Sequence, residues 1–111
     1  MTLSEKQAHF TQLLARLLTW AATQPGLSVV LGEVARTLEQ QRLYVQQGKS
    51  QTMQSKHLQR LAADVLVFQD GVYQTGSAAY RPLGEHWKML DSANKWGGDW
   101  GWDANHFEYA G

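Results

Sequence analysis

The chain has 111 residues, enough for one domain with a hydrophobic core but too few for a catalytic domain and an independent binding module. Its 10 basic and 10 acidic side chains cancel, which excludes an overall field that would attract nucleic acid or an anionic membrane surface. Cysteine is absent, which excludes disulfides and thiolate metal sites and leaves histidine and carboxylate as candidate ligands. We therefore predict a single domain over residues 1–111, whose partner is selected by a local site.

The first predicted element is an amphipathic helix that ends near Pro25. Its apolar residues recur at helical spacing between residues 10 and 21, and Thr2 with Glu5 forms a capping-box pair ahead of them. The apolar stripe is narrow and Arg16 interrupts it, which favours a helix that covers the core over one that enters a membrane. We assign no chemistry to this helix.

A strand and a second helix are predicted next. Residues 27–34 are rich in β-branched side chains and follow a Pro-Gly break, which indicates a strand that leads to Arg36 at the edge of the helix. Thr37 and Gln40 form a second capping-box pair, and Gly48 marks the C-terminal stop of the helix. The polar sequence after Gly48 predicts a loop.

The middle of the chain predicts a β-hairpin. Residues 62–68 form an apolar run in which Asp64 is the one charged residue. Asp70-Gly71 then forms a turn that leads into Val72-Tyr73. We expect the longer strand of this hairpin to be central in the sheet.

The C-terminal third predicts a helix, an irregular segment and a last strand. Pro82 suits the first position of a helix whose apolar side chains share one face. Residues 96–102 contain too much glycine for a regular element, while residues 106–109 can form a strand with His106 and Glu108 on one face. The order helix, strand, helix, hairpin, helix and strand predicts an α+β domain with a small, largely antiparallel sheet flanked by helices.

Asp64 is the residue of this pattern that most needs a partner. A carboxylate in an apolar strand requires compensation, and a salt bridge with Arg60 or a helix-cap contact would be enough. His57 lies seven residues earlier, a spacing that suits one ligand on a loop and a second ligand on the strand that the loop enters. This spacing favours a metal site and leaves the salt bridge as the alternative.

His106 is a candidate third ligand, because it enters the last strand from a glycine-rich loop that also carries an aspartate and an asparagine. Two histidines and one carboxylate are a known ligand set for catalytic zinc, with one position left for water, which points to a hydrolase. His9 and His86 lie within predicted helices, and we interpret them as surface or hydrogen-bonded residues. The carboxylates that could face a metal held by His106 and act as the base are Asp99, Asp103 and Glu108.

The chain also carries two separated motifs that match a known family in order and spacing. They are Ser55-X-His57 followed by Ala62-X-Asp64, and Asp103-X-X-His106-Phe107. Together they resemble the zinc peptidases of bacterial cell-wall peptides, whose fold is also seen in Hedgehog signalling domains. This family comprises D-alanyl-D-alanine carboxypeptidases and dipeptidases and the L-alanyl-D-glutamate endopeptidases used as phage endolysins. The resemblance covers about residues 27–109, including residues 36–41 and 80–87, and is strongest to the small phage endolysin type.

The resemblance implies a role for each matching residue. The residues that it assigns to Zn2+ binding and catalysis are His57, Asp64 and His106 as ligands and Asp103 as the catalytic carboxylate. Arg36 matches the arginine that steadies the substrate carbonyl or its oxyanion, and Ser55 matches the serine that contacts the substrate peptide. Arg60 departs from the family, since many relatives have glycine in this loop, and we expect it to alter loop shape more than metal binding.

The implied activity is that of a zinc metallopeptidase that hydrolyses peptidoglycan stem peptides. We expect a phage or prophage endolysin that cuts the L-alanyl–D-glutamate bond, and the alternative enzyme is a D-alanyl-D-alanine carboxypeptidase. A non-catalytic murein-binding module could instead stack sugar rings on Trp96, Trp100 and Trp102, although we favour roles for them in the core and the cleft wall. A metal-stabilised structural protein is a further alternative.

The expected partner is the peptidoglycan stem peptide, and we expect neither nucleic acid binding nor stable membrane insertion. The N-terminal residues lack the basic-then-apolar order of a secretory signal, which predicts synthesis in the host cytoplasm. A hydrolase of wall peptides would then need a holin-like membrane lesion to reach its substrate. We expect the protein to be a monomer.

Overall fold

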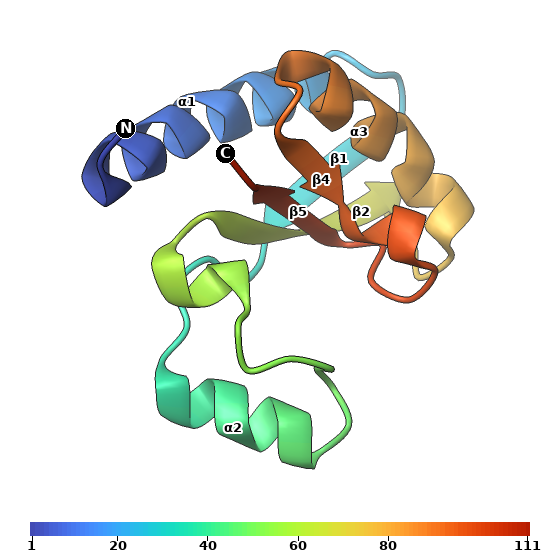
Figure 1. Cartoon of the computed structure of the whole chain (residues 1–111). Coiled ribbons are helices and arrows are strands. Elements are labelled where there is room, and N and C mark those ends of the chain that lie inside the picture. Colours follow the sequence, from blue (N-terminus) through green and yellow to red (C-terminus); the bar gives the residue numbers. More distant parts are fainter.

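The computed structural model describes residues 1–111. Its elements are α1 (Leu3–Ala22), β1 (Leu27–Leu31), α2 (Leu38–Gln46), the 3-10 helix η1 (Lys56–Gln59), β2 (Ala62–Gln69), β3 (Val72–Tyr73), α3 (Ser77–Leu90), β4 (Asn94–Trp96), the 3-10 helix η2 (Gly97–Trp100) and β5 (His106–Tyr109). The strands form one antiparallel sheet in the order β1-β2-β5-β4, with β3 also paired to β2 (Figure 1). The predicted α+β class is confirmed, and so is the central position of β2.

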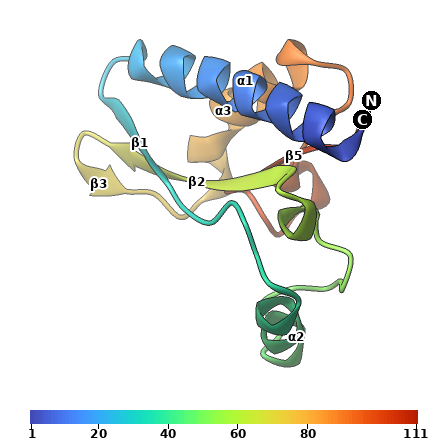
Figure 2. The same ribbon diagram turned by 90° about the vertical axis from the view of Figure 1, so that its left-hand side faces the viewer.

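The helices divide into two groups on opposite sides of the sheet. α1 and α3 pack together over one face, whereas α2 and η1 lie beyond the other face (Figures 1 and 2). Side chains alternate along β2, so Ala63, Val65 and Val67 are fully buried in the core on the α1 and α3 side. Asp64 lies between them in sequence and therefore points to the face that these two helices leave uncovered.

α1 begins and packs as its sequence predicts. The Thr2 hydroxyl accepts a hydrogen bond from the Glu5 N–H, and the Glu5 carboxylate accepts one from the Thr2 N–H, which completes the capping box. The buried side chains of α1 are Phe10, Leu13, Leu14, Leu17 and Ala21. No helix of the structure combines the length and the hydropathy that crossing a membrane requires.

β1 ends at Leu31, three residues before the predicted end at Val34. Beyond it the pairing with β2 continues in an irregular form, because the Gly32 N–H donates to Asp64 O (2.7 Å) and the Asp64 N–H donates to Glu33 O (2.8 Å). The backbones approach closely at Gly32, where an added Cβ would lie 3.2 Å from the Cβ of Asp64. The irregular pairing carries the chain from the edge of the sheet towards α2.

α2 is capped by Thr37 as predicted, but it does not cover the core. It projects away from the sheet (Figure 2), and its apolar residues Leu38 and Leu43 are about half exposed. The buried residue of α2 is Gln41, which is polar. The contacts of this helix with the rest of the protein are therefore mainly polar.

α3 begins at Ser77, five residues before Pro82, so the prediction that Pro82 opens this helix is wrong. A buried tyrosine accounts for the earlier start. The Tyr80 hydroxyl donates to Gln74 O (2.8 Å) and accepts from the Val67 N–H (3.3 Å), which fixes the first turn of the helix against β2. These tertiary contacts outweigh the hydrogen bond that Pro82 cannot donate.

The segment around Trp96 is more regular than predicted. Residues 94–96 form β4 and pair with β5, and residues 97–100 form η2 although they include two glycines. Trp96 has no exposed surface, and its Nε1–H donates to Ala104 O at 2.6 Å. A three-residue strand shows no alternation in sequence, so the buried indole and the pairing with β5 determine this segment.

Candidate metal centre

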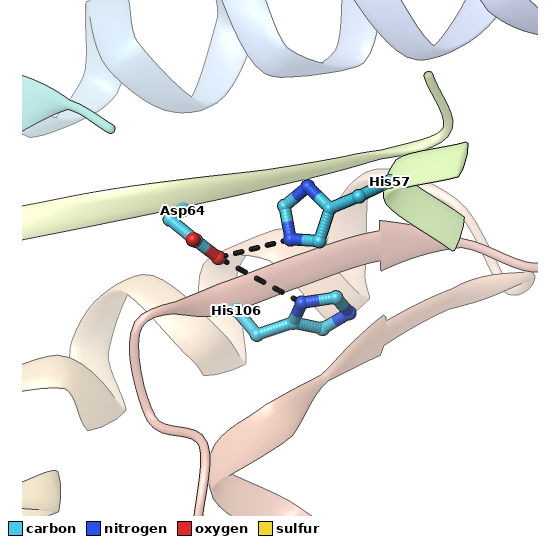
Figure 3. A group of neighbouring side chains, drawn as sticks. All are labelled: His57, Asp64 and His106. Atoms are coloured by element: carbon cyan, nitrogen blue, oxygen red, sulfur yellow. Dashed lines mark hydrogen bonds and ion pairs between the residues drawn. The ribbon is translucent and has the colours of Figure 1, made fainter. Parts of the chain in front are cut away.

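η1 positions the first candidate ligand, His57. Ser55 caps η1 by accepting from the His57 N–H at 3.2 Å, and Arg60 ends it in the left-handed conformation (φ 56°), which turns the chain into β2. The His57 ring is buried, and its Nδ1–H donates to Val34 O at 2.9 Å. Nε2 of His57 is therefore the ring nitrogen that faces the centre, and it is hydrogen-bonded to Asp64 Oδ1 at 3.1 Å (Figure 3).

β5 positions the second histidine, His106, opposite Asp64 in the antiparallel pairing. The His106 ring is buried, and its Nε2–H donates to Glu108 Oε1 at 2.8 Å. Nδ1 of His106 is therefore the ring nitrogen that faces the centre, and it lies 3.8 Å from Asp64 Oδ1. The prediction that His106 and Glu108 share one face of this strand is confirmed, and their hydrogen bond places Glu108 behind the ring.

The three predicted ligands meet at one point (Figure 3). One ligand atom from each of His57, Asp64 and His106 lies within 4.8 Å of the other two. Two imidazole nitrogens, once deprotonated, and a carboxylate oxygen are donors that suit Zn2+, and the remaining nitrogen of each ring is held by a carbonyl or a carboxylate, as in zinc sites. The donor set of this structure therefore fits a zinc ion.

The pKa values of Asp64 and His106 show that the site favours positive charge. Burial alone would raise the pKa of Asp64, but the hydrogen bonds and charges of His106 and His57 outweigh burial and lower the pKa to about 2. Burial alone would lower the pKa of His106, but Asp64 and Glu108 outweigh burial and raise the pKa to about 9. The surrounding carboxylates thus favour a cation at the centre.

Asp103 is the candidate base that faces the centre. Its Oδ2 lies 3.7 Å from Nδ1 of His106, the nitrogen that also faces Asp64. Burial raises the pKa of Asp103, which makes its carboxylate a better proton acceptor. Asp99 instead pairs with Lys88 at 2.8 Å, and Glu108 is bound behind His106. Geometry therefore separates Asp103 from the other two carboxylates that the residue types left open.

Arg36 is held beside the centre by a polar network. Its Nε–H pairs with the Glu33 carboxylate, and its Nη1–H donates to Gln41 Oε1 (2.8 Å) and to Ser55 Oγ (3.3 Å). Gln41 is fully buried and donates to Ser50 Oγ at 2.9 Å, which ties α2 to the loop before η1. Sequence reasoning missed the roles of Glu33 and Gln41, because a glutamate or glutamine near a helix start has the same pattern whether it is solvated or buried.

A cleft of about 450 Å³ opens over the metal centre. One part of its lining comes from residues 36–57, which include Arg36, Ser55 and the two cations Lys49 and Lys56. The other part comes from residues 100–108. A cleft of this size with convergent polar groups and shifted pKa values suits a small polar substrate such as a short peptide.

The tryptophans of the glycine-rich segment divide between the core and the cleft. Trp96 is buried in the core, while Trp100 and Trp102 line the cleft and are 41% and 46% exposed. Trp96 thus has the predicted position in the core, and Trp100 and Trp102 have the predicted position on the cleft wall.

The other two histidines lie away from the centre. His9 Nε2 pairs with Asp91 Oδ2 at 2.8 Å, and the His86 ring stacks on Trp20 with ring centroids 4.1 Å apart. Neither histidine lines the cleft. His9 is hydrogen-bonded, as interpreted, whereas His86 is half-buried in an aromatic stack.

A family model described as D-alanyl-D-alanine carboxypeptidase matches residues 48–109, more than half of the chain. The chain belongs to this peptidase family. The matched range includes the three candidate ligands and Asp103, whereas Arg36 and α1 lie before it. The resemblance inferred from the two motifs is therefore confirmed.

One relative and two solved structures are similar to the chain. The chain is 38% identical over 99 residues to an L-alanyl-D-glutamate peptidase of Listeria phage A118, a match that covers 86% of this chain and 34% of that protein. The L-Ala D-Glu endopeptidase ChiX of Serratia marcescens has a similar fold, with a TM-score of 0.77 at 24% identity over 92% of this chain and 78% of that chain. The D,D-pentapeptidase VanY of a VanB-type vancomycin resistance cassette, in complex with Zn(II), has a TM-score of 0.61 at 20% identity, over 93% of this chain and 71% of that chain.

Proposed function

We propose that the protein is a zinc-dependent peptidase of peptidoglycan stem peptides, of the phage endolysin type that cuts the L-alanyl–D-glutamate bond. The observation that carries this proposal is the convergence of the three ligand side chains and Asp103 in one cleft. The name of the phage relative, an L-alanyl-D-glutamate peptidase, supports the choice of bond.

The metal ligands and Asp103 would perform the chemistry together. His57, Asp64 and His106 would hold zinc, which when bound lowers the pKa of a water molecule and polarises a peptide carbonyl. Asp103 accepts the proton of the attacking water as general base. It then delivers this proton to the leaving amine as general acid, and the raised pKa of its carboxyl group favours the first of these two steps, the acceptance of the proton.

Arg36 would stabilise the charge that develops on the substrate carbonyl oxygen. Its guanidinium group is fixed at the cleft by Glu33 and Gln41 before a substrate arrives, so little reorganisation is needed during the reaction. Ser55 accepts hydrogen bonds from Arg36 and from the His57 N–H, which leaves its own O–H to donate to the substrate peptide.

The proposal includes one catalytic domain over residues 1–111 that acts as a monomer. One hydrophobic cluster joins α1, the sheet and α3, which supports a single domain. All groups of the proposed mechanism come from one chain, which supports a monomer. For a wall-peptide hydrolase made in the host cytoplasm, access to the substrate would follow a holin-like membrane lesion.

The test is to incubate the protein with isolated murein, with and without a zinc chelator, and to identify released peptides by mass spectrometry. We expect new ends at L-alanine and D-glutamate, which disappear with the chelator and return when Zn2+ is added in excess. The absence of any zinc-dependent product would contradict the proposal.

A D-alanyl-D-alanine carboxypeptidase is the second candidate, favoured by the description of the matching family model. The same experiment separates the two enzymes, since this activity would release only the terminal D-alanine. A murein-binding module without activity would instead keep its affinity for murein after zinc removal and yield no new ends.

A further inference from the structure

Trp100 and Trp102 present an exposed aromatic surface at the cleft. Their ring centroids lie 6.0 Å apart with an angle of 35° between the planes, and the Trp100 ring lies 5.2 Å from that of His106. Trp102 also lines two smaller hollows of about 310 and 240 Å³, which extend to Thr75 and, in the larger, to Tyr73. Trp102 therefore separates the metal centre from a second groove.

The loop that carries these indoles is held in place by its own contacts. Gly97 packs so closely on the next segment that an added Cβ would lie 2.1 Å from Asp103 O. Asp99 pairs with Lys88 of α3 at 2.8 Å, and Gly101 adopts a left-handed conformation (φ 86°) that favours glycine. A rigid aromatic surface loses little conformational entropy when it binds a ligand, so the loop is suited to recognition.

We propose that Trp102 is a stacking platform for a sugar ring of the glycan strand, so that the protein recognises the stem peptide together with the sugar that carries it. This inference rests on the proposed cleavage of the L-alanyl–D-glutamate bond. In peptidoglycan the first L-alanine is attached to muramic acid, which places the sugar next to the residue whose bond is cut. The D-alanyl-D-alanine end of the stem lies far from any sugar of its own strand.

The two linings of the cleft match the two chemical ends of such a substrate. The indole of Trp102 offers a flat apolar face for the C–H groups of a pyranose ring, while the ring hydroxyls remain in water at the open rim. Lys49 and Lys56, from the other stretch of the lining, offer positive charge to the carboxylates of the peptide. This division of polarity orients the sugar towards Trp102 and the peptide towards the lysines.

The first test compares kcat/KM for a muramyl tetrapeptide with that for the same tetrapeptide without the sugar. We expect the wild-type protein to prefer the sugar-linked substrate by about five- to tenfold, the effect of one ring-stacking contact. Trp102→Ala should abolish this preference through KM, and Trp102→Phe should restore most of it. Trp20→Ala is the control, because this indole stacks on His86 outside the cleft and should leave the ratio unchanged.

Equal rates on both substrates in the wild-type protein would overturn the platform while the proposed function stands. A Trp102→Ala protein that keeps the preference would overturn it as well. If neither substrate were cut at the L-alanyl–D-glutamate bond, the proposed function would fail. A measurement of sugar binding would then test the platform separately.

The binding test follows the five indole N–H signals by NMR while the peptide-free disaccharide of the glycan strand is added. We expect shifts in the signals of Trp100 and Trp102, and loss of this response in Trp102→Ala. Shifts caused by the free peptide and not by the disaccharide would assign the surface to a peptide side chain and overturn the sugar platform. This readout does not depend on turnover.

Discussion

At the residue scale, the metal centre depends on which nitrogen of each histidine ring faces Asp64. Val34 O fixes the tautomer of His57, and the Glu108 carboxylate fixes that of His106. Each contact engages the nitrogen on the far side of the ring, so the other nitrogen faces the centre and can bind a metal once it is deprotonated. Glu108 would therefore act on a bound metal through His106.

Replacement of Glu108 tests this second contact. We expect Glu108→Ala to lower zinc affinity by about 10- to 100-fold, because the His106 ring loses the partner that sets its tautomer and orientation. Competition with a chromogenic chelator measures the affinity. Glu85→Ala removes a carboxylate that is more than half exposed and contacts Arg81 and Lys88, and it serves as the control with unchanged affinity. Equal affinities in both variants would assign Glu108 no role at the metal.

The ligands and the proposed base should separate in a pair of variants. His57→Ala should lose bound zinc and activity together, because one of three ligands is missing. Asp103→Asn should retain zinc and the fold but lose turnover by about 100- to 10,000-fold, the usual contribution of a general acid–base. Metal analysis and peptidase rates on both proteins check this prediction. An active Asp103→Asn protein would remove Asp103 from the mechanism.

At the scale of elements, α2 is a helix whose importance lies in one buried polar residue. Gln41 accepts from Arg36 and donates to Ser50, so it links the helix to Arg36 and to the loop before η1. We expect Gln41→Leu to lower kcat by about 10- to 100-fold with zinc content unchanged, because a small misplacement of Arg36 weakens charge stabilisation. Gln46→Leu, at an exposed position of the same helix, is the matched control. A parallel loss of zinc in Gln41→Leu would show that α2 supports the metal centre instead.

The elements that the sequence predicted well are those with a strong local signal. The helical spacing and capping box of α1 and the Asp70-Gly71 turn after β2 correspond to observed elements. β4 and the start of α3 were not predicted, since distant contacts of Trp96 and Tyr80 determine them. A local sequence pattern does not predict contacts between residues that are distant in the chain.

The candidate site shows the same limit. The spacing of His57 and Asp64 indicated a loop ligand followed by a strand ligand, and the structure brings them together. The choice of Asp103 over other carboxylates required the family resemblance, and then the distances in the folded chain. The left-handed conformation of Arg60 favours glycine, the residue type that the family resemblance led us to expect in this loop.

At the scale of the whole molecule, the hydrophobic core and the candidate metal centre lie on opposite faces of the sheet. The core lies between the sheet and the pair α1 and α3, where Leu17 and Trp87 are fully buried, whereas the metal centre lies at the other face (Figures 1 and 2). Burial of such side chains contributes about 1.5–3 kcal/mol each to stability. The core should therefore fold without a metal.

Zinc removal tests this division. We expect the chelated protein to keep its far-UV circular dichroism spectrum at 25 °C. Its Tm should be roughly 10–20 °C lower than the Tm of the same protein in zinc at about 100 times the Kd for zinc. Binding at this excess adds about 2.7 kcal/mol to the free energy of unfolding, and 1 kcal/mol shifts the Tm of a domain of this size by about 4–8 °C. His57→Ala should show no zinc-dependent shift. Loss of the folded spectrum on chelation would instead identify the metal as a structural element, because the core alone would then be too weak to hold the sheet and helices together.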